Sequence, residues 1–182
     1  MKIKDTKLKN MCYNINMKKF YIFLDIDGVM WDWDYIISET DAGRRGKGGM
    51  INSFKPESIE ALNLLISQLG RTHDVQLVIS SSWKGNMART TKVLKDSGLL
   101  YDKRLARTPT YSTDRRGEEI LIYLNNNNKS DFVIIDDEMF DYSLYFKKEN
   151  IIKCEINHSA LSLKNVEEFL NNRGMQNSAF ER

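Results

Sequence analysis

Two carboxylates, Asp25 and Asp27, stand one residue apart at the end of the apolar run 20–24 and are followed by Gly28. Such a run, rich in aromatic and branched side chains, is typical of a strand buried on both faces of a parallel sheet. Like charges held close destabilise each other, and burial adds to that cost. A cation would remove the conflict, and carboxylate oxygens suit Mg²⁺. The alternative interpretation is a strand that simply runs into an acidic, solvated turn.

Two further apolar runs, 75–79 and 131–135, also end in polar residues. The first is followed by Ser80, with Ser81 close enough to substitute for it, and the second by Asp136 and Asp137. In an open parallel sheet the ligand crevice lies outside the carboxyl ends of the strands. Polar clusters at three strand ends therefore predict one shared site.

The elements that must position these residues alternate along the chain. Apolar periodicity predicts a fourth strand over residues 151–155, and residues 99–109 are an ambiguous segment that can hold another short strand. It also predicts four helices, over residues 57–69, 86–97, 117–124 and 163–170. This order predicts an α/β fold, a three-layer Rossmann-like parallel sheet flanked by helices. We expect residues 31–56 to form a loop that serves as a minimal cap, with its glycine-rich, cationic part closing over an anionic substrate.

Length and charge predict one domain with a basic tail. The chain has 182 residues and a net charge of +2. Residues 1–19 contain six lysines against Asp5, which gives +5 and leaves +2 − 5 = −3 for the remainder. We expect a flexible tail over residues 1–17 and a single domain over residues 18–182. The tail either binds nucleic acid through its lysines or only keeps the protein soluble.

Several classes of protein are disfavoured. No apolar run approaches the roughly 20 residues that span a bilayer, and the basic tail lacks the apolar core of a secretory signal. The two cysteines are too few for a disulfide framework. We therefore expect a reduced, cytoplasmic protein, a monomer with no membrane partner.

The motifs FLDIDGV, LVISSSW, RGEEI and VIIDD resemble those of the haloacid dehalogenase (HAD) superfamily of phosphohydrolases. More narrowly, they are similar to the small HAD domains of Swiss Army Knife RNA repair proteins. The resemblance runs from about Phe20 to the last predicted helix. It implies a HAD-like fold and a phosphatase that uses Mg²⁺.

Carried over residue by residue, the resemblance implies distinct catalytic roles. Asp25 would be the nucleophile that forms an aspartyl-phosphate. Asp27 would be the general acid–base and would bind the metal through its backbone carbonyl. Ser80, or alternatively Ser81, would donate a hydrogen bond to the phosphoryl group.

The resemblance also implies a cation and a metal site. Arg116, with Arg115 as the alternative, would offset charge on the phosphoryl oxygens, although the family usually has Lys there. Mg²⁺ would be held by four residues: Asp25, Asp27, Asp136 and Asp137. Asp136 stands where the family usually has Gly, so either adjacent acid could face the ion, and Asp141 would orient the ligands.

These inferences predict a Mg²⁺-dependent phosphomonoester hydrolase. A small cap suits bulky substrates, and the cations of the tail and of the loop at Arg44, Arg45 and Lys47 would steer a polyanion. The substrate would then be a nucleic-acid or nucleotide phosphate end. The alternatives are a catalytically silent module that binds nucleic-acid ends or phosphate, and a small-molecule phosphatase. The presence of both Asp25 and Asp27 favours an enzyme.

Overall fold

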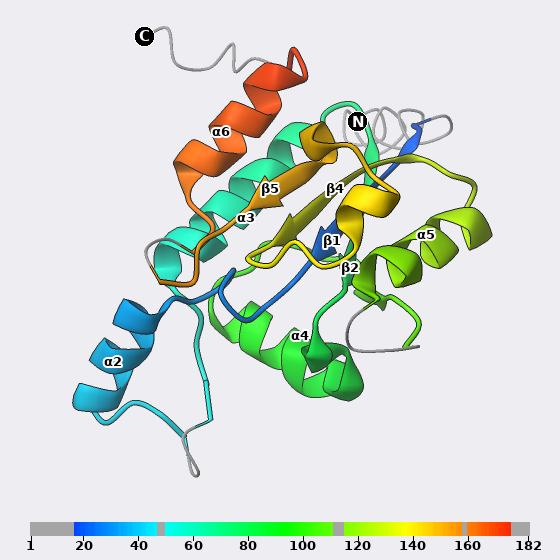
Figure 1. Ribbon diagram of the computed structural model, residues 1–182. Coiled ribbons are helices and arrows are strands. Elements are labelled where there is room, and N and C mark those ends of the chain that lie inside the picture. Colours follow the sequence, from blue (N-terminus) through cyan, green and yellow to red (C-terminus); the bar gives the residue numbers. More distant parts are fainter. Residues whose placement is uncertain (1–16, 47–49, 111–114, 158–159, 176–182) are drawn as a thin grey trace, which may run out of the picture.

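The computed structural model describes residues 17–46, 50–110, 115–157 and 160–175. Five parallel strands form one sheet in the order β3-β2-β1-β4-β5. Their bounds are β1 Lys19–Leu24, β2 Asp74–Ile79, β3 Ala106–Arg107, β4 Asp131–Asp136 and β5 Ile151–Lys153. The predicted parallel α/β fold is confirmed (Figure 1). The ambiguous segment does hold a short strand, β3.

Helices occupy the segments between the strands. The α-helices are α2 Trp33–Asp41, α3 Pro56–Leu69, α4 Met87–Asp96, α5 Arg116–Asn126 and α6 Leu163–Asn172. Short 3₁₀ helices are η2 Ser82–Asn86, η3 Tyr142–Leu144 and η4 Lys148–Asn150. The four predicted helices are α3 to α6, each displaced by only a few residues at its ends. Pro56 begins α3, where its fixed φ suits the first helical turn.

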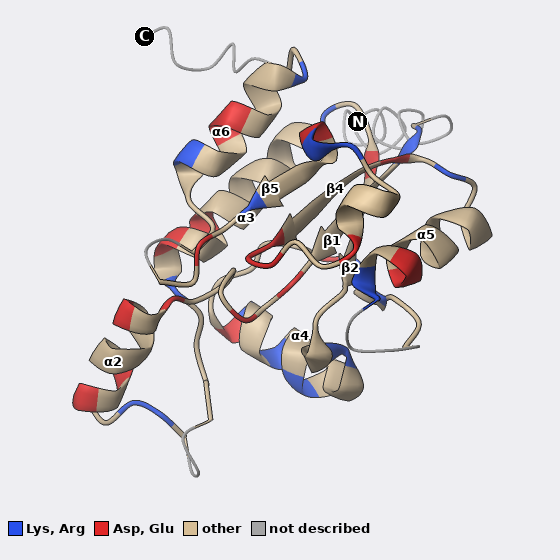
Figure 2. Ribbon diagram, viewed as in Figure 1, with Lys and Arg blue, Asp and Glu red and all other residues tan. Residues whose placement is uncertain are grey.

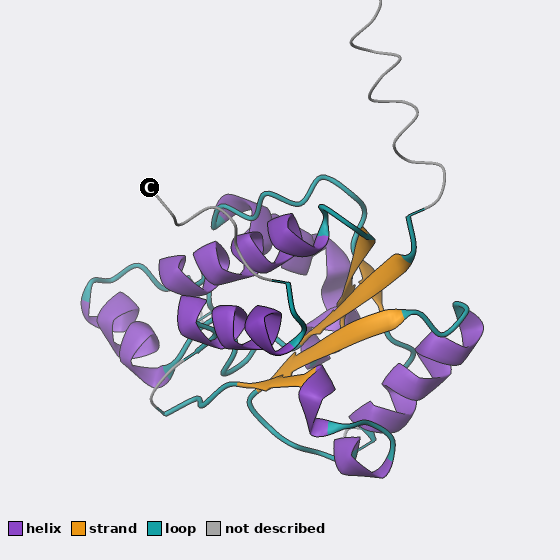
Figure 3. Cartoon of the chain, turned by 90° about the horizontal axis from the view of Figure 1, so that it is seen from above, coloured by secondary structure: helices purple, strands orange, loops and turns teal. Residues whose placement is uncertain are grey.

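The sheet is buried between two helical layers, as seen from above in Figure 3. Side chains of β1 alternate between two apolar clusters. Phe20, Ile22 and Leu24 join the cluster formed with α3, α4 and α6. Tyr21 and Phe23 join the cluster formed with α5 and η3. Burial on both faces explains why β1 is a continuous apolar run.

The strand register sets the composition of the carboxyl edge of the sheet. Leu24 at the end of β1 pairs with Ile79 of β2 and with Ile135 of β4. The residues that follow these three positions therefore lie in one row across the sheet, and they are Asp25, Ser80 and Asp136.

The prediction that residues 31–56 form a loop is wrong in part, because nine of them form α2. Asp32 caps this helix by accepting a hydrogen bond from Tyr35 N at 2.9 Å, and it also pairs with Lys55 Nζ at 2.5 Å. The helix is only nine residues long, and Ile36 is its one buried residue. Figure 1 shows α2 projecting from the body of the domain.

Residues 1–16 of the predicted tail and Lys47 of the predicted lid lie outside the described residues. Among the helices that the structure describes, none combines the length and the apolar character needed to cross a bilayer.

Candidate active site

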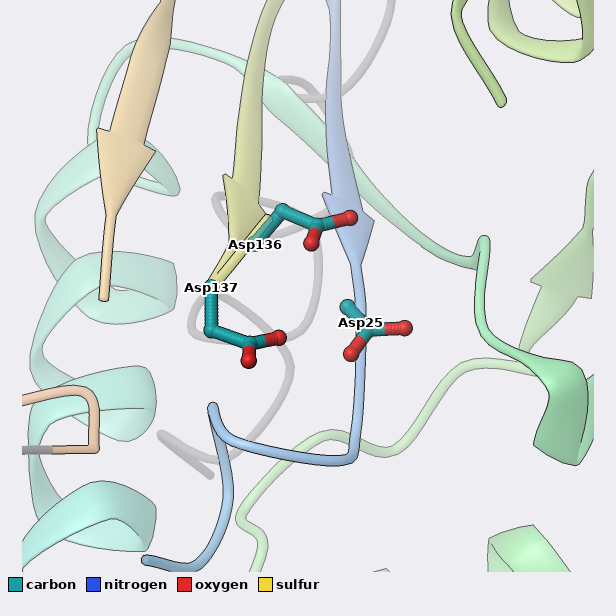
Figure 4. A group of neighbouring side chains, drawn as sticks. All are labelled: Asp25, Asp136 and Asp137. Atoms are coloured by element: carbon teal, nitrogen blue, oxygen red, sulfur yellow. The ribbon is translucent and has the colours of Figure 1, made fainter. Parts of the chain in front are cut away.

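Three carboxylates gather at the carboxyl ends of β1 and β4. Asp25, Asp136 and Asp137 each place one oxygen within 4.8 Å of the others. Figure 4 shows the three side chains converging between the two strand ends. Asp25 and Asp136 are buried, and Asp137 is half-buried. The side chain of Asp27 is not part of this cluster, and metal binding through its backbone carbonyl stays a prediction.

Arg116, the first residue of α5, brings a positive charge into the cluster. Its Nη1 donates to Asp25 Oδ1 and lies 3.4 Å from Asp136 Oδ2, and its guanidinium stacks on Phe140 at 4.5 Å. Arg115 instead points to the surface and pairs with Glu118 at 3.2 Å. Of the two predicted arginines, the structure places Arg116 at the carboxylates.

Asp141 holds the start of α5 rather than contacting the carboxylate cluster. Its two oxygens accept hydrogen bonds from Gly117 N at 2.6 Å and Glu118 N at 3.2 Å. An acidic side chain at a helix N-terminus satisfies free N–H groups and complements the helix dipole. Asp141 therefore orients Arg116, whereas the resemblance had implied that it orients metal ligands.

The cluster is electrostatically strained. Burial, reinforced by the Asp136 carboxylate, raises the pKa of Asp25 to about 8 even though Arg116 opposes the shift. Burial likewise raises the pKa of Asp136 to about 6 and raises the pKa of Asp137. Although burial lowers the pKa of Arg116, the two facing carboxylates outweigh it and raise that pKa. One arginine does not compensate the cost of burying these acids.

The donor set fits a divalent cation. When all are ionised, three carboxylates and Arg116 sum to −3 + 1 = −2. Carboxylate oxygens are the ligands that Mg²⁺ prefers. Asp136 already accepts hydrogen bonds from Tyr142 Oη at 2.6 Å and Glu138 N at 2.9 Å, so Asp137 has more acceptor capacity left for an ion.

Gly28 makes room for Asp137. It has a φ of +71°, and a Cβ built on it would lie 2.3 Å from Asp137 Cγ. Any other residue would be strained at this φ and would displace the carboxylate. The glycine after the two acids thus lets the turn of β1 approach the end of β4.

Ser80 presents a hydroxyl to the same edge. It is 1% exposed, and its Oγ has no hydrogen-bond partner. A buried polar atom without a partner costs free energy unless a ligand satisfies it. Ser81 is different, because its Oγ caps η2 by accepting from Trp83 N at 3.4 Å. Of the two hydroxyls at this edge, Ser80 Oγ is thus the one without a hydrogen-bond partner.

Sequence reasoning missed the partners of Asp27. Trp31 Nε1 and Trp83 Nε1 both donate to Asp27 Oδ1, at 3.2 and 2.9 Å. The only signal was position, since Trp31 follows Asp27 by four residues and Trp83 follows Ser80 by three.

It also missed a buried ion pair beside the site. Lys84 of η2 pairs with Glu119 of α5, and its Nζ also donates to Thr108 Oγ1 at 3.1 Å and to Pro109 O at 3.0 Å. Nothing in the sequence around a lysine in a polar turn indicates burial.

Comparison with protein families relates the chain to a known family. The family model described as the HAD domain in Swiss Army Knife RNA repair proteins matches residues 21–166, a span that contains every carboxylate of the site together with Ser80 and Arg116. Neither curated proteins nor solved structures gave a match.

Proposed function

Because the chain belongs to the family of HAD domains in Swiss Army Knife RNA repair proteins, we propose that this HAD-family hydrolase is a Mg²⁺-dependent phosphomonoester hydrolase. The observation that carries the proposal is the row of Asp25, Ser80 and Asp136 across one sheet edge, with Arg116 bound to both acids. A nucleophile, an unpartnered hydroxyl donor and a cation lie together there. Phosphoryl transfer requires these groups.

In the first step, a carboxylate oxygen of Asp25 attacks phosphorus. The bond from phosphorus to the leaving oxygen breaks, and Asp27 gives its proton to that oxygen. The product is an aspartyl-phosphate on Asp25 and a free alcohol. Arg116 and the Ser80 hydroxyl donate to the phosphoryl oxygens, where negative charge is concentrated.

In the second step, Asp27 takes a proton from water as the water oxygen attacks phosphorus. The bond between phosphorus and the Asp25 oxygen breaks, which releases inorganic phosphate and returns Asp27 to its protonated form. Mg²⁺ held by Asp25, Asp136 and Asp137 would neutralise carboxylate charge and polarise the phosphoryl group. That charge compensation keeps Asp25 ionised, as a nucleophile must be.

The proposed substrate is a phosphorylated nucleic-acid end. The description of the matched family names RNA repair, and a groove of about 1040 Å³ between α4 and β3 supplies positive charge. The groove extends from Arg107, which pairs with Ile79 at the carboxyl end of β2, to Lys103, which lies beside Asp74 at the start of β2. Its exposed cations are Lys95, Arg104, Arg107 and Lys103, the last of which is paired with Asp74 at 2.6 Å. Figure 2 shows Lys and Arg along α4, whereas the charged residues of α2 are acidic. The loop residue Arg44 is a weaker candidate, because it pairs with Glu39 at 2.7 Å.

The first experiment is hydrolysis of para-nitrophenyl phosphate with and without Mg²⁺, with Asp25→Asn as the matched variant. We expect turnover only with Mg²⁺, and a loss of at least about 10³-fold in the variant, because removing a nucleophile removes the covalent step. No turnover in the wild-type protein, together with phosphate binding, would support the silent binding module instead. Hydrolysis of small esters without any preference for oligonucleotide ends would leave a small-molecule phosphatase.

A further inference from the structure

Two of the three tryptophans of the chain donate hydrogen bonds to Asp27, and the third packs on one of those two. The indole N–H groups of Trp31 and Trp83 donate to the same oxygen, Oδ1, at 3.2 and 2.9 Å. Trp33 packs edge-on against the Trp31 ring, with the ring centroids 5.7 Å apart. The two donors come from different parts of the chain, one from the turn after β1 and the other from η2 after β2.

Packing fixes both donors without help from a substrate. Trp31 is buried, while Trp83 contacts the Phe54 ring, at 5.4 Å between ring centroids, and the Arg89 guanidinium, 4.9 Å from the Trp83 ring centroid. Arg89 is itself anchored by a hydrogen bond from Nη2 to a backbone carbonyl oxygen at 3.1 Å. Neither indole can rotate without breaking these contacts, so the Oδ1 atom that both of them bind is held in place.

The chemistry of the indole decides which oxygen of Asp27 can carry a proton. An indole N–H only donates, and a carboxylate oxygen offers two lone pairs. Two donors therefore occupy Oδ1. Any proton that Asp27 carries lies on Oδ2, and only Oδ2 remains for proton transfer.

We propose that Trp31 and Trp83 are positioning residues that hold Oδ1 of Asp27 so that Oδ2 faces the leaving oxygen of the substrate. The inference rests on the proposed function, in which Asp27 is the general acid–base. Proton transfer matters most when the leaving group is a poor one. Loss of an indole donor should thus lower kcat more than it raises KM, and should do so most for alkyl esters.

The kinetic experiment compares para-nitrophenyl phosphate with glycerol phosphate in Trp31→Phe, Trp83→Phe and the matched control Trp33→Phe. Phenylalanine keeps an aromatic ring at each position but removes the N–H group. We expect the first two variants to lower kcat for glycerol phosphate about tenfold more than for the nitrophenyl ester, with KM little changed. Trp33→Phe should leave the ratio between the two esters unchanged, because Trp33 reaches Asp27 only through the Trp31 ring.

A second measurement does not depend on activity or on metal. In nitrogen–proton correlation NMR spectra of the metal-free protein, Asp27→Ala removes the acceptor of both indole donors. We expect the Trp31 and Trp83 indole signals to shift and to exchange faster with solvent, while the Trp33 signal moves least. This reading stands even if a tryptophan variant fails to fold.

The outcomes separate the positioning role from the proposed function. Equal slowing of both esters in the Trp31 and Trp83 variants, or unmoved indole signals in Asp27→Ala, overturns the inference while the hydrolase stands. A folded wild-type protein that hydrolyses neither ester with Mg²⁺ overturns the proposed function and the proton-transfer role with it. The predicted kinetic split together with shifted indole signals supports both.

Discussion

At the scale of single residues, the catalytic role of Asp25 and its burial favour opposite protonation states. A nucleophile must be ionised, yet burial and the neighbouring Asp136 raise the pKa of Asp25 to about 8. Without a cation, burial therefore favours the protonated form of this carboxyl group. This conflict has a consequence for stability that can be measured without any substrate.

The first prediction concerns stability and pH in the metal-free protein. A carboxyl group whose pKa is raised by folding contributes stability that is fully present below its ordinary pKa and is lost as pH rises through about 8. Asn at position 25 does not titrate. We therefore expect Asp25→Asn to become more stable relative to wild type between about pH 5 and about pH 9. The free energy of unfolding of the variant relative to wild type should rise by at least about 1 kcal/mol, which corresponds to about 2–4 °C in melting temperature.

The measurement is thermal unfolding in the presence of a chelator, followed by circular dichroism at several pH values. Asp34→Asn is the control, because it makes the same substitution at an exposed position on α2. A difference for Asp25→Asn that is flat, or that shrinks as pH rises, would contradict the assignment of a strained carboxyl group. Adding Mg²⁺ should stabilise the wild-type protein most at the high end of the range.

The second prediction separates the adjacent acids at the end of β4. Asp136 already accepts hydrogen bonds from Tyr142 and from Glu138 N, whereas Asp137 lies against Gly28 with more acceptor capacity left. We expect Asp137→Asn to lower Mg²⁺ affinity on the order of tenfold more than Asp136→Asn does. The readout is the rise in melting temperature during a Mg²⁺ titration of each variant. A larger loss in Asp136→Asn would reverse the assignment.

At the scale of elements, a buried ion pair joins the segment after β2 to α5. Lys84 and Glu119 have side chains that are 9% and 2% exposed, and Thr108 and Pro109 supply further acceptors for the Lys84 ammonium. Because α5 also carries Arg116, this pair links the Ser80 end of the site to its cation.

The third prediction is that Lys84→Met lowers the free energy of unfolding by about 3–5 kcal/mol, because the buried carboxylate of Glu119 loses the ammonium group that faces it. Adding Glu119→Gln to that variant should recover part of the loss. Denaturation in urea gives the values. The control is Lys92→Met, which breaks the exposed pair with Asp96 and should cost less than about 1 kcal/mol. Similar losses for the two lysines would show that the buried pair does not hold η2 and α5 together.

The same elements show what sequence reasoning can and cannot reach. Strands β1, β2 and β4 were predictable because burial on both faces demands continuous apolar runs, and the parallel arrangement then places their acidic and polar ends at one edge. Helix α2 was missed because it is short, with Ile36 as its one buried residue, and because the glycines after it indicated a loop.

The details of the site were out of reach for a different reason. Trp83 reaches Asp27 across 56 positions, and Lys84 reaches Glu119 across 35. Such contacts depend on the depth and the direction of a side chain, which a residue type alone does not specify. Arg116 could be favoured over Arg115 only once the start of α5 and its cap, Asp141, were placed.

At the scale of the whole molecule, charge is distributed unevenly around the site. Figure 2 shows acidic residues at the carboxyl edge and on α2. The groove between α4 and β3 is lined by Lys and Arg side chains. Strand β3 pairs with the end of β2, at Val78 and Ile79, so the groove starts next to the row that contains Ser80. A polyanion whose terminal phosphate occupied the site could therefore continue into this groove.

The fourth prediction tests that path. Lys95 and Arg104 are exposed in the groove. If a single-stranded oligonucleotide contacts both, each contact removed should reduce by about 0.7 the slope of the logarithm of affinity against the logarithm of salt concentration. We expect Lys95→Gln/Arg104→Gln to lower kcat/KM for a phosphorylated oligonucleotide and to reduce the slope of its salt dependence by about 1.4. The rate of para-nitrophenyl phosphate hydrolysis should stay unchanged. The control, Lys92→Gln/Lys164→Gln, removes the same charge from exposed positions outside the groove and should change the oligonucleotide rate much less. Equal losses in both double variants would show that net charge, rather than the groove, attracts the substrate. An oligonucleotide rate insensitive to salt and to both changes would rule out a nucleic-acid end and favour a small phosphate ester.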